Sequence, residues 1–322
     1  MPNQTAAPER RRLRRSQRPH AERNAGVRFP RWYWPSFTAP GTIWLLLLFV
    51  VPFYVAVSVA FGTVDFFQNP LPVYQPWYWS GATFVDSLHR FTAAGEEGFY
   101  RPALLRTLLY VPIASLICLV FGYAIAYYVA RHGGRRKGMF LILLISPFWI
   151  SYLMRIYAWQ GLLQDDGFIN KTLQFLHLTG SPVNWLQGRP ITVVLGLVYG
   201  YIPYMILPLY GQLDRVDSSL LEAGRDLGAS PLQTFTRVTL PQSRQAILAG
   251  LIIVSLPMFG DYFTNDLLGS TKTSMFGNLI DTAIQGQGQA PQAASLVLML
   301  IVLLLIPLWY YLRSTKRAQE AL

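Results

Sequence analysis

Apolar residues in this chain fall into long runs that are separated by short polar segments. Six of these runs are about 20 residues long, the length that an α-helix needs to cross the hydrocarbon core of a bilayer. We therefore predict an all-α polytopic membrane protein with six transmembrane helices. The predicted spans are residues 41–61, 103–130, 139–159, 191–212, 246–265 and 293–312.

Prolines recur within these apolar runs. A proline inside a helix removes a backbone hydrogen bond, and membrane helices tolerate this loss where neighbouring helices or a water-filled path satisfy the freed carbonyls. Kinked spans are compatible with a moving pathway and equally with a static fold. The prolines are Pro52, Pro112, Pro147, Pro203, Pro208, Pro257 and Pro307.

A polar segment between the fourth and fifth runs carries paired helix signals. Ser219 followed by Glu222 has the spacing of a capping box, which predicts a helix start. Gly228 predicts the end of that helix in a left-handed turn, because glycine enters this conformation without a Cβ penalty. A second helix is predicted to begin directly afterwards, from the cap, first-turn and capping-partner residues Ser230, Pro231 and Gln233.

Each of these two short helices has an apolar face. In the first, the spacing places Leu220, Ala223, Gly224 and Leu227 together, and in the second it places Leu232, Phe235 and Val238 together. Taken alone, this pattern fits a solvated connecting loop or a docking element for a partner.

Composition supports the membrane assignment and excludes other classes. Hydrophobic residues make up 52% of the chain and charged residues 13%, which is typical of a polytopic membrane protein. The chain has one cysteine, Cys118, and four scattered histidines. It therefore has neither a disulfide framework nor a cysteine-based metal site, and we predict no metal site.

The distribution of positive charge predicts orientation. Nine Lys and Arg residues lie in 1–35, four in 131–138, four in 211–245 and three after residue 312, which is 20 of the 27 in the chain. By the positive-inside rule, both termini and the 211–245 loop are cytoplasmic. We predict a disordered basic tail at 1–35, a transmembrane domain at 36–322 and no nucleic-acid partner, because charge that flanks membrane spans is already explained by orientation and by lipid.

The predicted external segments differ in character from the cytoplasmic ones. Residues 62–102 are rich in aromatic side chains and prolines, which favours either an interfacial aromatic belt or a docking surface. Asp165 and Asp166 in the segment 160–190 fit a solvated acidic pair. The aromatic residues are Phe66, Phe67, Tyr74, Trp77, Tyr78 and Trp79.

No catalytic site is predicted, because the sequence has no phosphate-binding loop, zinc-protease motif or nucleophile elbow. Candidate solute contacts lie near the end of the fifth run. Asp261 and Asp266 are carboxylates that lipid would not tolerate, and Phe259, Tyr262 and Phe263 beside them are able to attract an ammonium group. For Asp266, a helix cap is the alternative role. Arg155 is predicted to extend to the outer interface rather than to bind a solute.

The segment from Glu222 to Pro241 resembles the cytoplasmic "EAA" loop of ABC-transporter permeases, whose pattern is Glu-Ala-Ala-x3-Gly-x9-aliphatic-x-Leu-Pro. Gly224 replaces the usual second alanine, and Val238 replaces the usual isoleucine. The resemblance implies that the first helix enters a groove on a cytoplasmic ATPase. The coupling residues so identified are Glu222, Ala223, Gly224, Asp226, Leu227, Gly228, Leu240 and Pro241.

The resemblance covers most of residues 40–315 and is closest to permeases of the spermidine/putrescine type. Four segments carry it: SPFWISYLMRIYAWQGLLQDDGFIN from 146, GLVYGYIPYMILPLY from 196, LLEAGRDLGASPLQTFTRVTLP from 220 and DYFTNDLLG from 261.

It implies a type I importer permease in the bacterial inner membrane. The expected partners are an ABC ATPase dimer that binds ATP and Mg²⁺, a second and different permease chain, an external solute-binding protein and a small-molecule substrate. No cofactor is expected on this chain.

The solute is expected to be a polyamine. Another small cation, a metal chelate, an amino-phosphonate or a sugar derivative would fit the same architecture. An ion-coupled transporter and an intramembrane enzyme are the alternative classes, but each needs a functional group in mid-membrane that the sequence does not reveal.

Overall fold

The computed structural model describes residues 32–93, 98 and 100–320. The chain divides into two compact units, residues 1–53 and 54–322. Their boundary falls within the first long helix, α1 (Tyr33–Ala60). Most of the predicted basic tail lies outside the described residues, so its disorder stays a prediction.

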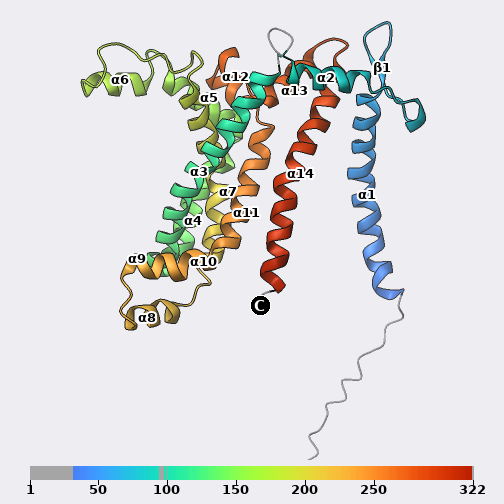
Figure 1. Cartoon of the computed structure of the whole chain (residues 1–322). Coiled ribbons are helices and arrows are strands. Elements are labelled where there is room, and N and C mark those ends of the chain that lie inside the picture. Colours follow the sequence, from blue (N-terminus) through green and yellow to red (C-terminus); the bar gives the residue numbers. More distant parts are fainter. Residues whose placement is uncertain (1–31, 94–97, 99, 321–322) are drawn as a thin grey trace, which may run out of the picture. The chain divides into compact units, whose positions relative to one another are not determined.

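Long apolar helices account for four of the six predicted spans (Figure 1). Among the described residues these are the helices that are long and apolar enough to cross a membrane by themselves, and up to six spans result if each of two bent helix pairs counts as one. The four are α1, α3 (Arg101–His132), α7 (Pro190–Leu213) and α14 (Ala290–Glu320).

The third predicted span, 139–159, is sharply bent at a break just after Pro147, one of the prolines at which a kink is predicted. Its two halves meet at 84°. Pro147 lies in the short 3-10 turn before the break, and Ile150 directly after that turn has an extended backbone. The elements are η3 (Gly134–Arg136), α4 (Lys137–Ile145), η4 (Ser146–Trp149), α5 (Tyr152–Leu163) and α6 (Phe168–Phe175).

The fifth predicted span is shorter than expected. Helix α11 (Arg244–Phe259) ends before the predicted boundary at 265, because the chain turns at Gly260 just after Pro257. A separate short helix, α12 (Phe263–Leu268), follows. Before α11 the chain bends by 63° from the segment Pro231–Gln242, which belongs to the predicted cytoplasmic loop.

The core of the second unit lies where α3, α7 and α11 pack against one another. Met205 of α7 is fully buried between two glycines on the neighbouring helices. A Cβ atom on Gly122 of α3 would lie 3.0 Å from Met205 Cγ, and one on Gly250 of α11 would lie 2.6 Å from Met205 Sδ. Small residues therefore allow the three helices to approach closely, as is typical in membranes.

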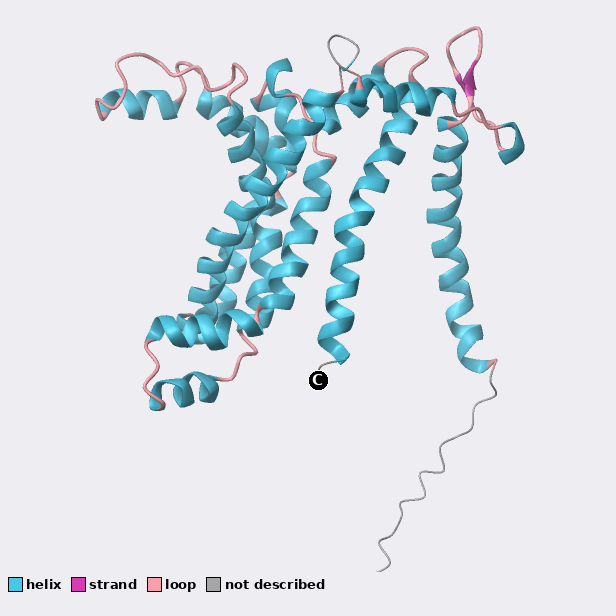
Figure 2. Ribbon diagram, viewed as in Figure 1, coloured by secondary structure: helices cyan, strands magenta, loops and turns pink. Residues whose placement is uncertain are grey.

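Short elements lie at both ends of this bundle. In Figure 1, α8 (Ser218–Asp226), α9 (Pro231–Thr234) and α10 (Leu240–Gln242) lie at one end of α3, α7 and α11. The elements α6, α12 and α13 (Phe276–Gln285) lie at the other end. A single antiparallel strand pair, in which Thr63 is opposite Leu71, is the described β-structure (Figure 2). The remaining elements are β1 (Thr63–Val64), β2 (Pro70–Leu71), η1 (Pro76–Tyr78), α2 (Ala82–Thr92), η6 (Thr271–Thr273) and α13 (Phe276–Gln285).

Candidate coupling site and solute path

The first helix of the predicted coupling loop is α8 (Ser218–Asp226), and Asp217 caps it. The Asp217 carboxylate accepts a hydrogen bond from the Ser219 backbone N–H at 3.0 Å, and this bond lowers the pKa of Asp217 below its usual range. The prediction that Ser219 caps the helix is therefore wrong. Asp217 is already extended and is an equally good cap, so the helix starts earlier.

The end of α8 confirms the predicted left-handed turn. Gly228 has φ +81°. Its N–H donates to the Arg225 carbonyl at 2.8 Å, and the Ala229 N–H donates to the Gly224 carbonyl at 3.0 Å. This pair of bonds is a Schellman motif, which satisfies carbonyls that the helix end would otherwise leave free.

The second helix starts as predicted. Ser230 and Gln233 form a complete capping box around Pro231 at the first helical position. The helix then changes geometry, because α9 (Pro231–Thr234) continues as a π-helical segment, η5 (Phe235–Thr239), and ends as α10 (Leu240–Gln242). Leu232 is 71% exposed while Phe235 and Val238 are half-buried, so the predicted shared face holds only in part.

Most of the predicted coupling residues are exposed within this chain. Leu227, directly after α8, is 88% exposed and is thus an uncovered apolar side chain among the described residues. Gly224 is half-buried against Thr234 of α9. The exposed residues of the set are Glu222, Ala223, Asp226, Leu227, Gly228, Leu240 and Pro241.

The base of the coupling loop is tied to the preceding membrane elements. Lys137 Nζ lies 2.5 Å from Asp214 Oδ1. Arg131 Nη1, at the end of α3, donates to the Val216 carbonyl at 3.0 Å. The segment that leads into α8 is therefore held against the end of α3.

The structure places Asp261 in a buried polar cluster between three helices. Asp261 is 6% exposed. Its carboxylate accepts hydrogen bonds from Tyr152 Oη of α5 at 2.6 Å, from Tyr201 Oη of α7 at 3.1 Å and from the Oγ1 and N of Thr264 in α12. These donors account for the burial of the carboxylate without a solute. Tyr152 and Tyr201 are far apart in sequence, so no local pattern could reveal this cluster.

The other predicted path residues lie near the same corner. Asp266 of α12 is exposed and accepts a hydrogen bond from Asn278 Nδ2 at 2.6 Å. Partial burial, and then the neighbouring Asp281 carboxylate, raise the pKa of Asp266. Phe259 and Tyr262 are half-buried, and the ring of Tyr262 stacks on that of Phe263.

Arg155 does not extend to an interface as predicted, since it is 6% exposed. Its guanidinium carbon lies 4.3 Å from the ring centroid of Phe148, 5.6 Å from that of Tyr152 and 5.9 Å from that of Tyr199. Because the third span is broken, Phe148 lies against Arg155 in the first turn of α5. The faces of the three aromatic rings attract the guanidinium cation. Among the described residues, neither Nε nor Nη1 of Arg155 has a hydrogen-bond partner.

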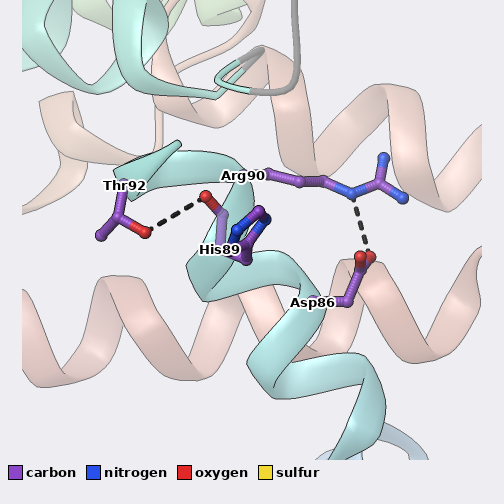
Figure 3. A network of polar contacts seen from close by, with 4 residues as sticks. All are labelled: Asp86, His89, Arg90 and Thr92. Carbon is purple, nitrogen blue, oxygen red and sulfur yellow. Dashed lines mark hydrogen bonds and ion pairs between the residues drawn. The ribbon is translucent and has the colours of Figure 1, made fainter. Parts of the chain in front are cut away.

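A cavity of about 750 Å³ lies among α2, α3, α13 and the start of α14. Its lining includes Arg90 and Arg106 but no carboxylate among the described residues, which makes it unsuited to a cationic solute. Figure 3 shows helix α2, which contributes Arg90 to the lining. Arg90 Nε lies 2.9 Å from Asp86 Oδ2, and Thr92 Oγ1 lies 3.2 Å from the His89 carbonyl oxygen. The described residues contain no group of three or more His, Cys, Asp or Glu side chains that could hold a metal ion.

Comparisons with known proteins agree with this geometry. Residues 107–319 match the family model "Binding-protein-dependent transport system inner membrane component". The chain is 33% identical over 276 residues to "Spermidine/putrescine transport system permease protein PotB" of Escherichia coli (strain K12), which covers 85% of this chain and 94% of that protein. It is 31% identical over 272 residues to "Inner membrane ABC transporter permease protein YdcU" of the same organism, which covers 80% and 85%.

A solved "bacterial ABC transporter involved in the import of the acidic polysaccharide alginate" contains a chain of similar fold. The TM-score is 0.69 at 18% identity, covering 89% of this chain and 96% of that one. At this identity the likeness concerns the fold alone. From the family match and the close relatives, this chain is a multi-pass inner-membrane protein and belongs to the family of binding-protein-dependent transport system inner membrane components.

Proposed function

We propose that this chain is a permease subunit of an ATP-driven importer whose solute is a polyamine such as spermidine or putrescine. The observation that carries the proposal is the 33% identity to a spermidine/putrescine permease across 85% of the chain. The exposed helix α8, with its glycine turn at Gly228, supports an importer that is powered by a separate ATPase. A second permease chain and an external solute-binding protein complete the proposed complex.

Coupling takes place at α8 in this proposal. The helix docks in a groove of the ATPase, and the uncovered apolar residue directly after it, Leu227, enters the contact. Glu222 lies on the polar side of the helix. When ATP binding closes the two ATPase subunits, α8 moves with them, and the packed spans convert that movement into exchange between outward-open and inward-open arrangements.

The solute path passes close to α12 in this proposal. Asp266 is exposed and lies near enough to Asp281 to respond to its charge, so two carboxylates favour an ammonium-bearing solute there. Phe259 and Tyr262 supply aromatic surface beside them. Asp261 was predicted to have the same role, but its satisfied contacts favour a structural anchor that joins α5, α7 and α12.

Reconstitution tests the function. The chain is assembled with its cognate ATPase, second permease and binding protein in liposomes, and uptake of labelled spermidine is measured with ATP or with a non-hydrolysable analogue inside. We expect uptake only with ATP and with the binding protein present. ATP-dependent uptake of another solute with no uptake of polyamines would contradict the solute assignment. Uptake by this chain alone, driven by an ion gradient, would contradict the importer class.

A further inference from the structure

Phe235, the first residue of η5 in the coupling loop, contacts α3 through its aromatic ring. Its ring lies edge-on to two tyrosines one helical turn apart. The centroid distances are 5.6 Å to Tyr123 at 88° and 5.7 Å to Tyr127 at 86°. Edge-to-face geometry at these distances is the favourable arrangement for aromatic pairs, and it fixes the orientation of the ring as well as its position.

The backbone around Phe235 is unusual for a connecting loop. Residues Phe235–Thr239 form a π-helical segment, and the Leu240 N–H donates to the Phe235 carbonyl. Such segments are rare and are often found at functional sites. The buried Thr239 Oγ1 in this segment has no hydrogen-bond partner among the described residues. The π-helical backbone and the unpaired Thr239 hydroxyl both cost free energy, and the segment that contains them places Phe235 against the two tyrosines.

Further contacts tie both ends of the coupling loop to the same helix. At the exit, Tyr123 Oη lies 2.9 Å from Ser243 Oγ, which in turn donates to the Leu240 carbonyl at 3.0 Å. On the entry side, Arg131 Nη1 donates to the Val216 carbonyl. The α3 residues in these contacts lie within the last three turns of the helix, so α3 contacts the loop near its entry, at Phe235 and at its exit.

Direct packing continues from α8 to the core through this contact. A Cβ atom on Gly224 of α8 would lie 3.6 Å from Thr234, which is buried and directly precedes Phe235. Beyond the two tyrosines, Gly122 of α3 packs on Met205 of α7. Each step is a close contact between regular elements, which is how displacement is transmitted through a packed interior.

We propose that Phe235, held between Tyr123 and Tyr127, is the positioning residue that transmits movement of the docking helix α8 to α3. The inference rests on the proposed function, because it assumes that α8 binds the ATPase. It adds to that function a specific contact, that of Phe235 with Tyr123 and Tyr127, through which the movement passes. Without the ring, α8 moves with the ATPase while α3 no longer follows it, so ATP is hydrolysed with little transport.

The test uses the reconstituted complex with Phe235→Ala, Phe235→Tyr and Tyr127→Ala. For Phe235→Ala and Tyr127→Ala we expect normal assembly and ATP hydrolysis, with solute transported per ATP reduced by about fivefold or more. One lost aromatic pair corresponds to about this factor; Tyr127→Ala loses one such pair and Phe235→Ala loses two. Phe235→Tyr keeps the ring and restores the ratio. Tyr128→Ala is the matched control, since Tyr128 lies beside Tyr127 on α3 but is 57% exposed.

Two outcomes of this experiment would overturn the proposal. One is a transport-to-ATP ratio in Phe235→Ala equal to that of the unsubstituted complex. The other is a parallel fall of transport and hydrolysis that follows the amount of assembled complex, because that pattern indicates a purely structural role.

A second measurement tests the contact between Phe235 and α3 independently of the proposed function. Hydrogen exchange of the purified chain should show that Phe235→Ala speeds amide exchange in 218–242 and in 123–131 together, whereas Tyr128→Ala does not. Faster exchange in 218–242 alone would mean that the loop and α3 are not coupled through Phe235. If the unsubstituted chain binds no ATPase, the proposed function is wrong. The exchange experiment still tests whether Phe235 couples the loop to α3, because it needs only the purified chain.

Discussion

Gly224 and Gly228 lie in the same segment, which we propose docks on the ATPase, but they have different backbone requirements. Gly228 has φ +81°, and the space that a Cβ atom would occupy there is open, so a side chain meets backbone strain without a clash. Gly224 is helical, and a Cβ atom would make an ordinary 3.6 Å contact with Thr234. The backbone conformation therefore requires glycine at position 228, whereas position 224 also has room for alanine.

We expect Gly228→Ala to destabilise the turn by about 1–2 kcal/mol, which weakens binding of the ATPase while membrane insertion stays normal. Gly224→Ala should stabilise α8 by up to about 1 kcal/mol. Thermal unfolding of the purified chain and copurification of the ATPase measure both effects. Equal effects of the two substitutions would show that the left-handed turn has no special role.

Asp261→Asn tests whether the buried carboxylate anchors helices or contacts the solute. The amide replaces an acceptor that serves Tyr152, Tyr201 and Thr264. Because hydrogen bonds to a charged group contribute about 1.5–3 kcal/mol each, we expect a clear loss of thermal stability with unchanged uptake per assembled complex. A fall in that normalised uptake would instead place Asp261 in the solute path.

At the scale of elements, α8 depends on a charged cap. The pKa of Asp217 is lowered by the Ser219 N–H, so the ionised form is favoured in the folded helix. The cap therefore contributes fully above the ordinary aspartate pKa of about 4, and this contribution is lost as the pH falls through the lowered value.

Acidification should consequently loosen α8, and Asp217→Asn should remove that dependence, because asparagine caps a helix equally well without a charge. The measurement is the amide-exchange protection of 218–228, corrected for intrinsic rates, at neutral pH and at a pH of about 3, below the ordinary aspartate pKa. The same loss of protection in the asparagine variant would mean that another group causes the acid effect.

In the broken third span, side chains from the two halves contact each other and the neighbouring helix α7. Phe148 precedes the break and Arg155 follows it, yet their side chains are in contact. Tyr152 begins the second half and packs against Gly200 of α7, where a Cβ atom would lie 2.5 Å from the tyrosine ring. After the break, the ring of Tyr152 thus packs on α7.

At the scale of the whole molecule, topology is open to a direct test. Single cysteines at Ser230 and Gln75, both exposed, are introduced in a Cys118→Ala background. From the charge asymmetry, an impermeant thiol reagent should label Ser230→Cys only from the cytoplasmic side and Gln75→Cys only from the outside. Labelling of both from one side would refute the predicted orientation.

Much of the fold could be predicted because hydrophobic length and turn chemistry act locally. The four long spans follow from the cost of placing polar groups in lipid. The turn at Gly228 and the cap at Ser230 depend on residues within a few positions of one another, and both are confirmed. The start of α8 was misplaced because two nearby residues, Asp217 and Ser219, were both able to cap it.

The sequence by itself determined the membrane class, the four long spans and the helix–turn–helix segment around Gly228, since each depends on composition or on short-range spacing. Only the tertiary structure decided which side chains meet across helices. Asp261 is held by tyrosines from two other helices, Arg155 by rings on both sides of a break, and Phe235 by two tyrosines of α3. These contacts depend on crossing angles, glycine contacts and a π-helical segment, and such features arise from the packing of several helices at once.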